Sequence, residues 1–179
     1  MLTITVPGAE YYNPQTEEFV YTKDQTLTLE HSLVSLSRWE SKWNIAFLSK
    51  EPKTNEQLLD YIKFMTLTQN VSPEVYTRLT PKNFQEINEY IDLPMTATTF
   101  SDNQTSRNKE IITAEIIYYW MIAQNIPFEC QKWHLNRLLA LIKVCSIKNT
   151  PPKKMSRSEI LNRNRSLNAS RRKALGTKG

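Results

Sequence analysis

Glycine is scarce in this chain, and its positions limit what the backbone can do. Only Gly8, Gly176 and Gly179 occur among the 179 residues. Loops that hold phosphates, dinucleotides or calcium depend on glycines for positive φ angles and for close backbone approach. No glycine lies between residues 9 and 175. The sequence therefore argues against nucleotide-binding P-loops, Rossmann dinucleotide sites and EF-hands.

Charge divides the chain into two parts. Residues 1–150 carry 14 basic and 17 acidic side chains, whereas residues 151–179 carry nine basic and one acidic. Pro151 and Pro152 stand at the join, and each proline disfavours helix in the residue before it. The sequence has no run of 18 apolar residues and no signal-peptide pattern at its start. We therefore expect no membrane contact and a location in the cytoplasm, where Cys130 and Cys145 would be buried thiols.

Hydrophobic spacing predicts a mainly α fold. Alternating apolar residues at the start predict a small β hairpin or meander within residues 1–27, with turns at Pro7-Gly8 and Asn13-Pro14. From Thr28, taken as a helix cap, leucines and aromatic residues recur every three or four positions. We expect a compact helical domain over residues 28–149 and a basic C-terminal arm over residues 150–179.

Capping signals predict the individual helices. Thr54 and Gln57 predict a helix over about residues 55–66, and the pairs Ser72-Pro73 and Thr80-Pro81 each predict a helix start. The second of these helices must stop before Pro94. Residues 95–108 are polar and predict a loop. Residues 110–124 are apolar on almost every face and predict a buried central helix, paired with a helix over about 129–148 that Trp133 opens.

No catalytic, cofactor or metal site is predicted. Cys130 and His134 lie four residues apart, but no second ligand pair completes a metal shell, so packing is the better explanation. A Cys/His nucleophilic pair would also need an oriented base and an oxyanion hole. His31 is expected to be an ordinary residue of the first helix. The sequence thus predicts a protein that is not an enzyme.

Aromatic residues of the first helix are candidate partner contacts. Most of the four tryptophans and eight tyrosines should be buried, because each covers 150–250 Å². Exposed aromatic residues supply many interface hot spots. If part of the first helical stripe is not core, Trp39, Trp43 and Phe47 are the predicted contacts with a partner.

The basic arm permits two interpretations. Its basic residues could neutralise phosphates and so bind nucleic acid without sequence preference. Alternatively, the arm docks on an acidic partner through Ile160, Leu167 and Ala174, which recur at seven-residue intervals. The stripe is thin, so we expect the arm to be helical only when bound. The basic residues concerned are Lys153, Lys154, Arg157, Arg163, Arg165, Arg171, Arg172 and Lys173.

Four segments resemble one family of phage proteins. They are LEHSLVSLSRWESKW at 29–43, MTLTQNVSPEVY at 65–76, PMTATTF at 94–100 and EIIYYWMIAQNIPFECQKWHLNRLLALIKVC at 115–145. Together they resemble tail assembly chaperones of long-tailed (siphovirus-type) bacteriophages and prophages. The resemblance implies a helical, non-enzymatic protein of the host cell cytoplasm. It implies binding to the tape measure protein, help for tail tube assembly, and in many members a longer frameshifted form.

The resemblance sets the expected function and leaves alternatives open. We expect a tail assembly chaperone whose client is the tape measure protein, the tail tube protein or both, with homo-oligomers possible. One alternative is a structural component of the virion, in the tail or the head–tail connector. The other is a nucleic-acid-binding protein acting through the basic arm.

Overall fold

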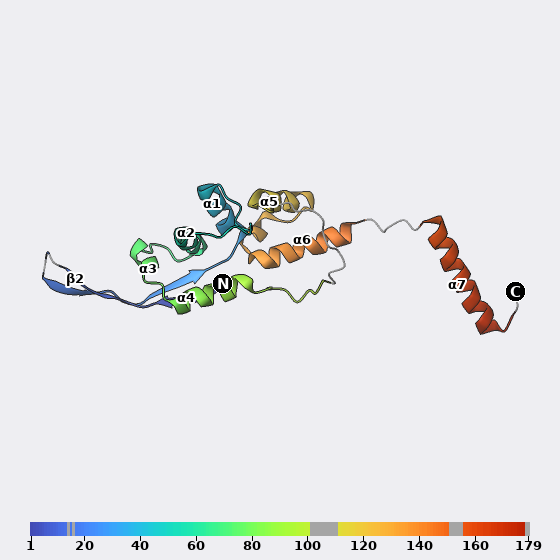
Figure 1. The fold of residues 1–179 in the computed structure, drawn as a ribbon, viewed down its shortest axis with the longest axis horizontal. Coiled ribbons are helices and arrows are strands. Elements are labelled where there is room, and N and C mark those ends of the chain that lie inside the picture. The colour runs from blue at the N-terminus through green and yellow to red at the C-terminus, as the bar shows by residue number, and fades with distance from the viewer. Residues whose placement is uncertain (14, 16, 101–110, 151–155, 178–179) are drawn as a thin grey trace. The chain divides into compact units, whose positions relative to one another are not determined.

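The computed structural model describes residues 1–13, 15, 17–100, 111–150 and 156–177. It divides into two compact units, Met1–Ser146 and Ile147–Gly179. The described residues are mainly helical, with short antiparallel strands at the N-terminus, which confirms the predicted fold class (Figure 1). The order is β1 Leu2–Val6, β2 Glu10–Asn13, β3 Glu18–Tyr21, β4 Gln25–Leu29, α1 Leu33–Trp43, α2 Asn55–Met65, α3 Pro73–Thr77, α4 Pro81–Asp92, α5 Ala114–Ala123, the 3-10 helix η1 Phe128–Lys132, α6 Leu135–Asn149 and α7 Arg157–Leu175.

The four strands form one long two-stranded ribbon. β1 pairs with β4 and β2 pairs with β3, and both pairs are antiparallel. The two residue numbers of every pair add to 31 in both ladders, so the two ladders share one register. Val6 thus pairs with Gln25, and Glu10 with Tyr21. The break between the ladders falls at Pro7, which has no N–H to donate. The predicted turn at Pro7-Gly8 is wrong, because the chain continues in the same register.

The break is held by a local hydrogen-bond network. The amide of Ala9 donates to Thr22 Oγ1 at 2.8 Å, and the amide of Thr22 donates to the carbonyl of Ala9 at 2.8 Å. Arg78 Nη1 donates to the carbonyl of Pro7 at 2.9 Å and to Thr22 Oγ1 at 2.8 Å. Gly8 lies between them, and a Cβ at that position would be 2.0 Å from the Thr22 carbonyl oxygen.

The substitution Gly8→Ala is expected to destabilise unit Met1–Ser146. Relieving a clash with backbone requires a strand to shift and the network around Thr22 to weaken, at a cost of about 1–3 kcal/mol in the free energy of unfolding. Urea unfolding followed by tryptophan fluorescence measures it. Gly176→Ala is the contrast: nothing lies within 4 Å of its Cβ position, although its φ is +63°. Equal unfolding midpoints for the two variants would contradict the close approach at Gly8.

The first helix begins later than predicted. Thr28 belongs to β4, where it pairs with Thr3, and its carbonyl accepts a hydrogen bond from the amide of Leu67 at 2.8 Å. A residue held in a strand on both sides cannot cap a helix. Ser32 caps α1 instead, in a capping box with Ser35, and the helix ends at Trp43 before Asn44 in the left-handed conformation. Phe47 therefore lies outside the helix.

The helices with local start signals are where the sequence predicts them. Thr54 and Gln57 form the capping box of α2, and α3 begins at Pro73. Thr80 caps α4, which ends at Asp92, two residues before Pro94. Part of the predicted loop 95–108, residues 101–108, lies outside the described residues.

The last segment of unit Met1–Ser146 differs from its prediction. Residues 129–148 do not form one helix that Trp133 opens. η1 ends at Lys132, Trp133 is extended, and α6 starts at Leu135. The cause is a contact distant in sequence: the amide of Leu135 donates to the carbonyl of His31 at 2.7 Å, and His134 forms an isolated bridge with Ser32. The chain must extend there to reach the segment before α1.

Helix α1 separates two clusters of buried apolar side chains. Trp39 faces the first cluster, with the inner face of β1 and β4 and residues of α2, α3 and α4. Leu33 and Leu36 face the second cluster, with residues of α5, η1 and α6. The second cluster contains Cys130, so this thiol is a packing residue. An amphipathic helix normally buries one face, and α1 is covered on two.

Candidate partner-binding surfaces

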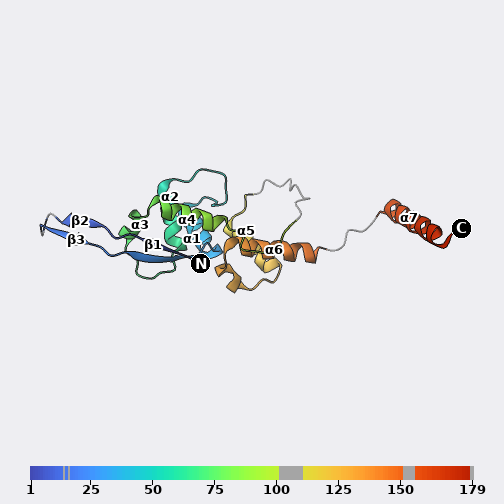
Figure 2. The same ribbon diagram turned by 90° about the horizontal axis from the view of Figure 1, so that it is seen from below.

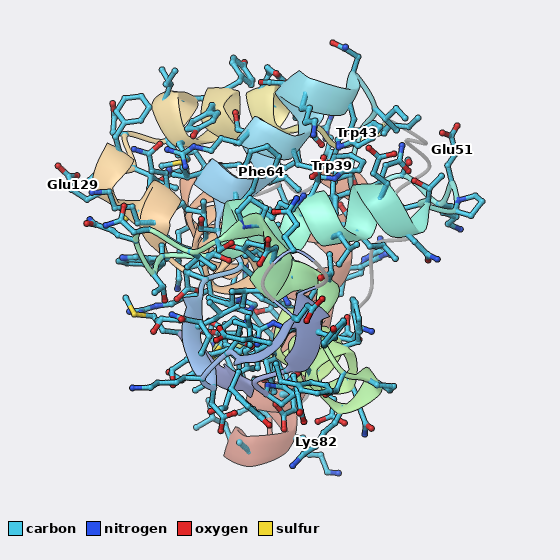
Figure 3. The ribbon with its side chains drawn as sticks, turned by 90° about the vertical axis from the view of Figure 1, so that its left-hand side faces the viewer. Trp39, Trp43, Glu51, Phe64, Lys82 and Glu129 are labelled. Carbon is cyan, nitrogen blue, oxygen red and sulfur yellow. The ribbon has the colours of Figure 1, made fainter. Side chains whose placement is uncertain are left out.

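The predicted contact residues of the first helix lie mainly in the core. Trp39 has no solvent exposure, and its Nε1–H donates to the carbonyl of Gln57 at 2.7 Å. Figure 3 shows Trp39 and Trp43 between α1 and α2. Trp43 and Phe47 are half-buried, and the Phe47 ring stacks on Tyr61 with 3.9 Å between centroids. Trp39 is not available to a partner in this fold, and Trp43 and Phe47 are available only in part.

Glu40 fixes the position of the segment that carries Phe47. One carboxylate oxygen of Glu40 accepts the amide of Phe47 at 2.8 Å, and the other accepts the amide of Ala114 at 2.7 Å. Burial raises the pKa of Glu40, and these two amides oppose that effect by stabilising the charged form. Glu40 thus joins α1, the loop after it and the first turn of α5. An open depression beside it is lined by Glu40, Ser41, Asn44, Ile45, Ala46, Thr113 and Glu115.

An exposed apolar face on α5 and η1 is the first surface that the sequence prediction missed. The sequence predicts that residues 110–124 form a buried central helix, and this prediction is wrong for one side of α5. Ala114, Ile117 and Met121 are buried on one side, whereas Tyr119 is 66% and Ile122 is 61% exposed on the other. Large exposed apolar side chains flank them before and after the helix, namely Ile111 and Phe128. We call Tyr119, Ile122 and Phe128 the α5 face.

A second exposed aromatic surface lies on the hairpin β2–β3. Tyr12 and Phe19 are direct cross-strand partners with ring centroids 5.3 Å apart. Tyr21 lies on the same face, since it is two residues from Phe19, and all three rings are more than half exposed. In Figures 1 and 2 this hairpin extends beyond the helices of unit Met1–Ser146. We call Tyr12, Phe19 and Tyr21 the hairpin face.

The basic arm is a helix in the structure. Ser156 and Glu159 form the predicted capping box of α7, and Gly176 ends the helix in the left-handed conformation. Every described residue from Ser156 to Thr177 is exposed. Lys153 and Lys154 lie outside the described residues, whereas the other predicted basic residues all lie on α7: Arg157, Arg163, Arg165, Arg171, Arg172 and Lys173. That the helix depends on a partner stays a prediction.

The two histidines meet in the interior of unit Met1–Ser146. His31 precedes α1 instead of lying within it, so its predicted place is wrong, and its ring centroid is 5.1 Å from that of His134. His31 Nδ1 is 2.6 Å from Tyr61 Oη. Burial lowers the pKa of His31 to about 4, with repulsion from a charged His134 as the second cause.

His134 is held by backbone groups on both ring nitrogens. Its Nε2 is 3.0 Å from the carbonyl oxygen of Tyr90, so Nε2 carries the proton, and its Nδ1 accepts the amide of Asn136 at 3.3 Å. Burial lowers the pKa of His134, although the Tyr90 carbonyl and Glu30 act in the opposite direction. With both nitrogens engaged, this ring is a structural group and has no free position for a substrate.

Cys130 and His134 are both buried, as packing residues would be. Within the residues that the structure describes, no cluster of three or more His, Cys, Asp or Glu side chains could hold a metal ion. None of the described helices is long and apolar enough to cross a membrane.

Comparison with known proteins gives no relative from which a role could be taken. No family model, no curated protein and no solved structure matches this chain.

Proposed function

We propose that this chain is a non-enzymatic phage tail assembly chaperone, whose client is the tape measure protein. The observation that supports this role is the α5 face. Two aromatic side chains and one aliphatic side chain there are each more than half exposed. Large exposed apolar patches on small proteins mark interaction sites, and an apolar surface beside a helix suits an amphipathic helix of a client.

The position of the α5 face agrees with the resemblance to tail assembly chaperones. Tyr119, Ile122 and Phe128 all fall in the segment 115–145 that resembles the family. A tape measure protein is long, helical and apolar, so a chaperone needs a surface that covers apolar helices. The flanking side chains Glu115 and Glu129 are exposed and add a polar rim.

Replacing Tyr119 and Ile122 by serine is expected to weaken client binding without affecting the fold. Each side chain is exposed, so each substitution should change the free energy of unfolding by no more than about 0.5 kcal/mol, as is usual at the surface. Loss of two contacts at an interface centre lowers affinity by about tenfold to a hundredfold. The measurement is co-purification of the tagged chain with the long helical protein encoded beside it, after nuclease and in high salt.

The matched control replaces Leu58 and Leu67 by serine. These leucines are 40% and 50% exposed on other parts of the same unit. Client recovery should be unchanged in this control. Equal recovery with both double variants, or no client through high salt with the unmodified chain, would reject the α5 face as the client site.

Nucleic-acid binding through α7 is a second candidate function. The exposure of all six basic residues of this helix favours it. Affinity for duplex would then fall with salt, with a slope of about −0.9 for each phosphate contacted. Removing residues 153–179 would abolish it. The arm has no aromatic residue for base stacking, which leaves only charge to hold the nucleic acid.

A further inference from the structure

The hairpin face continues a buried face of the ribbon. Ile4, Val6, Leu27 and Leu29 point into the first core cluster. The register of the ribbon is unbroken, and side chains alternate with a period of two, so Tyr12, Phe19 and Tyr21 fall on the same side of the ribbon as these core residues. The apolar side of the ribbon therefore runs on past the helices that cover its first half. On its second half, Tyr12, Phe19 and Tyr21 are each more than half exposed.

The hairpin that carries this face is acidic. Residues 10–21 contain Glu10, Glu17 and Glu18 and neither lysine nor arginine. Glu10 accepts a hydrogen bond from the hydroxyl of Tyr21, which raises the pKa of that tyrosine. A ligand for this surface should combine an apolar stripe with positive charges, because Glu10 lies on the same side of the ribbon as the three rings and Glu17 lies in the adjoining turn.

Helix α7 has the complementary pattern. Ile160, Leu167 and Ala174 recur every seven residues and so lie on one narrow line along the helix. At 100° per residue, Arg163 and Arg171 fall about 40° to either side of Leu167. The helix carries six basic residues and one acidic residue, Glu159. An arginine beside an aromatic ring adds cation–π attraction to the charge pairing.

The two surfaces also match in length. Ile160 and Leu167 are about 10 Å apart along a helix. Phe19 and Tyr21 are about 7 Å apart along a strand, and their rings extend that span. One α7 helix can therefore lay its apolar line across the hairpin face.

A second copy of the chain can supply this helix. The charge of the arm complements that of the hairpin, because residues 151–179 carry nine basic side chains and one acidic side chain. Two copies that exchange arms make the contact twice, as expected for a twofold-symmetric dimer.

We infer that the hairpin face binds helix α7 of a second copy of this chain, through charge and apolar contact, to form an arm-exchanged dimer. The inference does not rest on the proposed chaperone function. It concerns the hairpin and the arm, whereas the client is proposed to bind the α5 face.

The test measures self-association of the nuclease-treated full-length chain by sedimentation equilibrium over a range of concentrations. An arm variant carries Arg171→Glu, Arg172→Glu and Lys173→Glu, and a hairpin variant carries Glu10→Lys and Glu17→Lys. Each variant alone should raise the dimer dissociation constant at least about tenfold. An equimolar mixture should associate again, since the native arm of one variant meets the native hairpin of the other.

Two controls separate this contact from general charge effects. The variant Arg38→Glu, Lys50→Glu, Lys132→Glu changes the charge as much as the arm variant does, at exposed sites of unit Met1–Ser146, and should dimerise normally. Phe19→Ser should weaken the dimer without altering charge. Circular dichroism of each variant checks that the fold is retained.

Three outcomes would overturn the inference. One is a chain that stays monomeric at every concentration, as expected if the arm docks within its own chain or nowhere. The second is a dimer that is unaffected by the arm variant. The third is association that is present before nuclease treatment and absent after it, which would assign the arm to nucleic acid. Client recovery with the α5 face variants is measured separately, so either proposal can fail alone.

Discussion

Trp39→Ala is expected to cause the largest loss of stability of any substitution considered for this protein. The side chain has no solvent exposure, and its Nε1–H donates to the carbonyl of Gln57. Truncation leaves a cavity between α1 and α2 and a buried carbonyl without a donor. Core Trp→Ala substitutions cost about 3–5 kcal/mol. Since small domains are stable by only about 5–15 kcal/mol, much of the margin would be lost.

Urea unfolding followed by far-UV circular dichroism measures this loss, and Trp43→Ala is its matched control. Trp43 lies one helical turn further on α1, is half-buried, and its ring centroid is 6.5 Å from that of Trp39. We expect a loss of about 1–2 kcal/mol there, in the usual range for a partly buried side chain. If the Trp39→Ala variant unfolds like the unmodified chain but no longer recovers client, Trp39 is a contact with the partner and not a core residue.

Acid is expected to unfold the protein in a window set by its buried histidines. In the folded chain the pKa of His31 is about 4, against 6.5 for an ordinary histidine. Between these values the unfolded chain binds more protons than the folded one, so stability falls as pH falls from about 6.5 to about 4. His31 alone accounts for about 3 kcal/mol of this loss. The lowered pKa of His134 acts in the same direction.

Other titratable groups also contribute to the pH dependence of stability, and their contribution must be distinguished from that of His31. Tyr90 Oη donates to Glu30 at 2.7 Å, and the other oxygen of Glu30 is 3.1 Å from the N-terminal amine of Met1. Glu40 acts in the opposite direction, because its raised pKa makes protonation favour the fold. Urea midpoints of the unmodified chain and of His31→Asn, measured from pH 7.5 to 4, isolate the contribution of His31.

The His31→Asn variant starts less stable at neutral pH, since it loses packing and the contact with Tyr61. Its stability should depend less on pH between about 6.5 and 4 than that of the unmodified chain. Parallel curves for the two proteins would show that His31 does not titrate in this window. They would then assign the acid sensitivity to His134 or to the carboxylates.

The amino-acid sequence alone determined the elements whose signals are local. Thr54 with Gln57, Ser72 with Pro73, and Thr80 with Pro81 mark helix starts that the structure confirms. Capping depends on residues within one turn, so distant parts of the chain hardly alter it. The charge division also needed only the sequence, and the predicted box at Ser156 and Glu159 starts α7. The role of tail assembly chaperone, which the resemblance implies, stays a prediction.

Only the tertiary structure decided which apolar residues are covered. The residues around Thr28 predict a helix cap. In the structure Thr28 pairs instead with Thr3, which lies more than twenty positions earlier in the chain. Trp39 and Tyr119 are both aromatic residues of helices, yet one is buried and the other exposed. Hydrophobic spacing reports which residues could be buried, whereas burial itself depends on what packs against each face. For the same reason the α5 face and the hairpin face became visible only once the chain was folded.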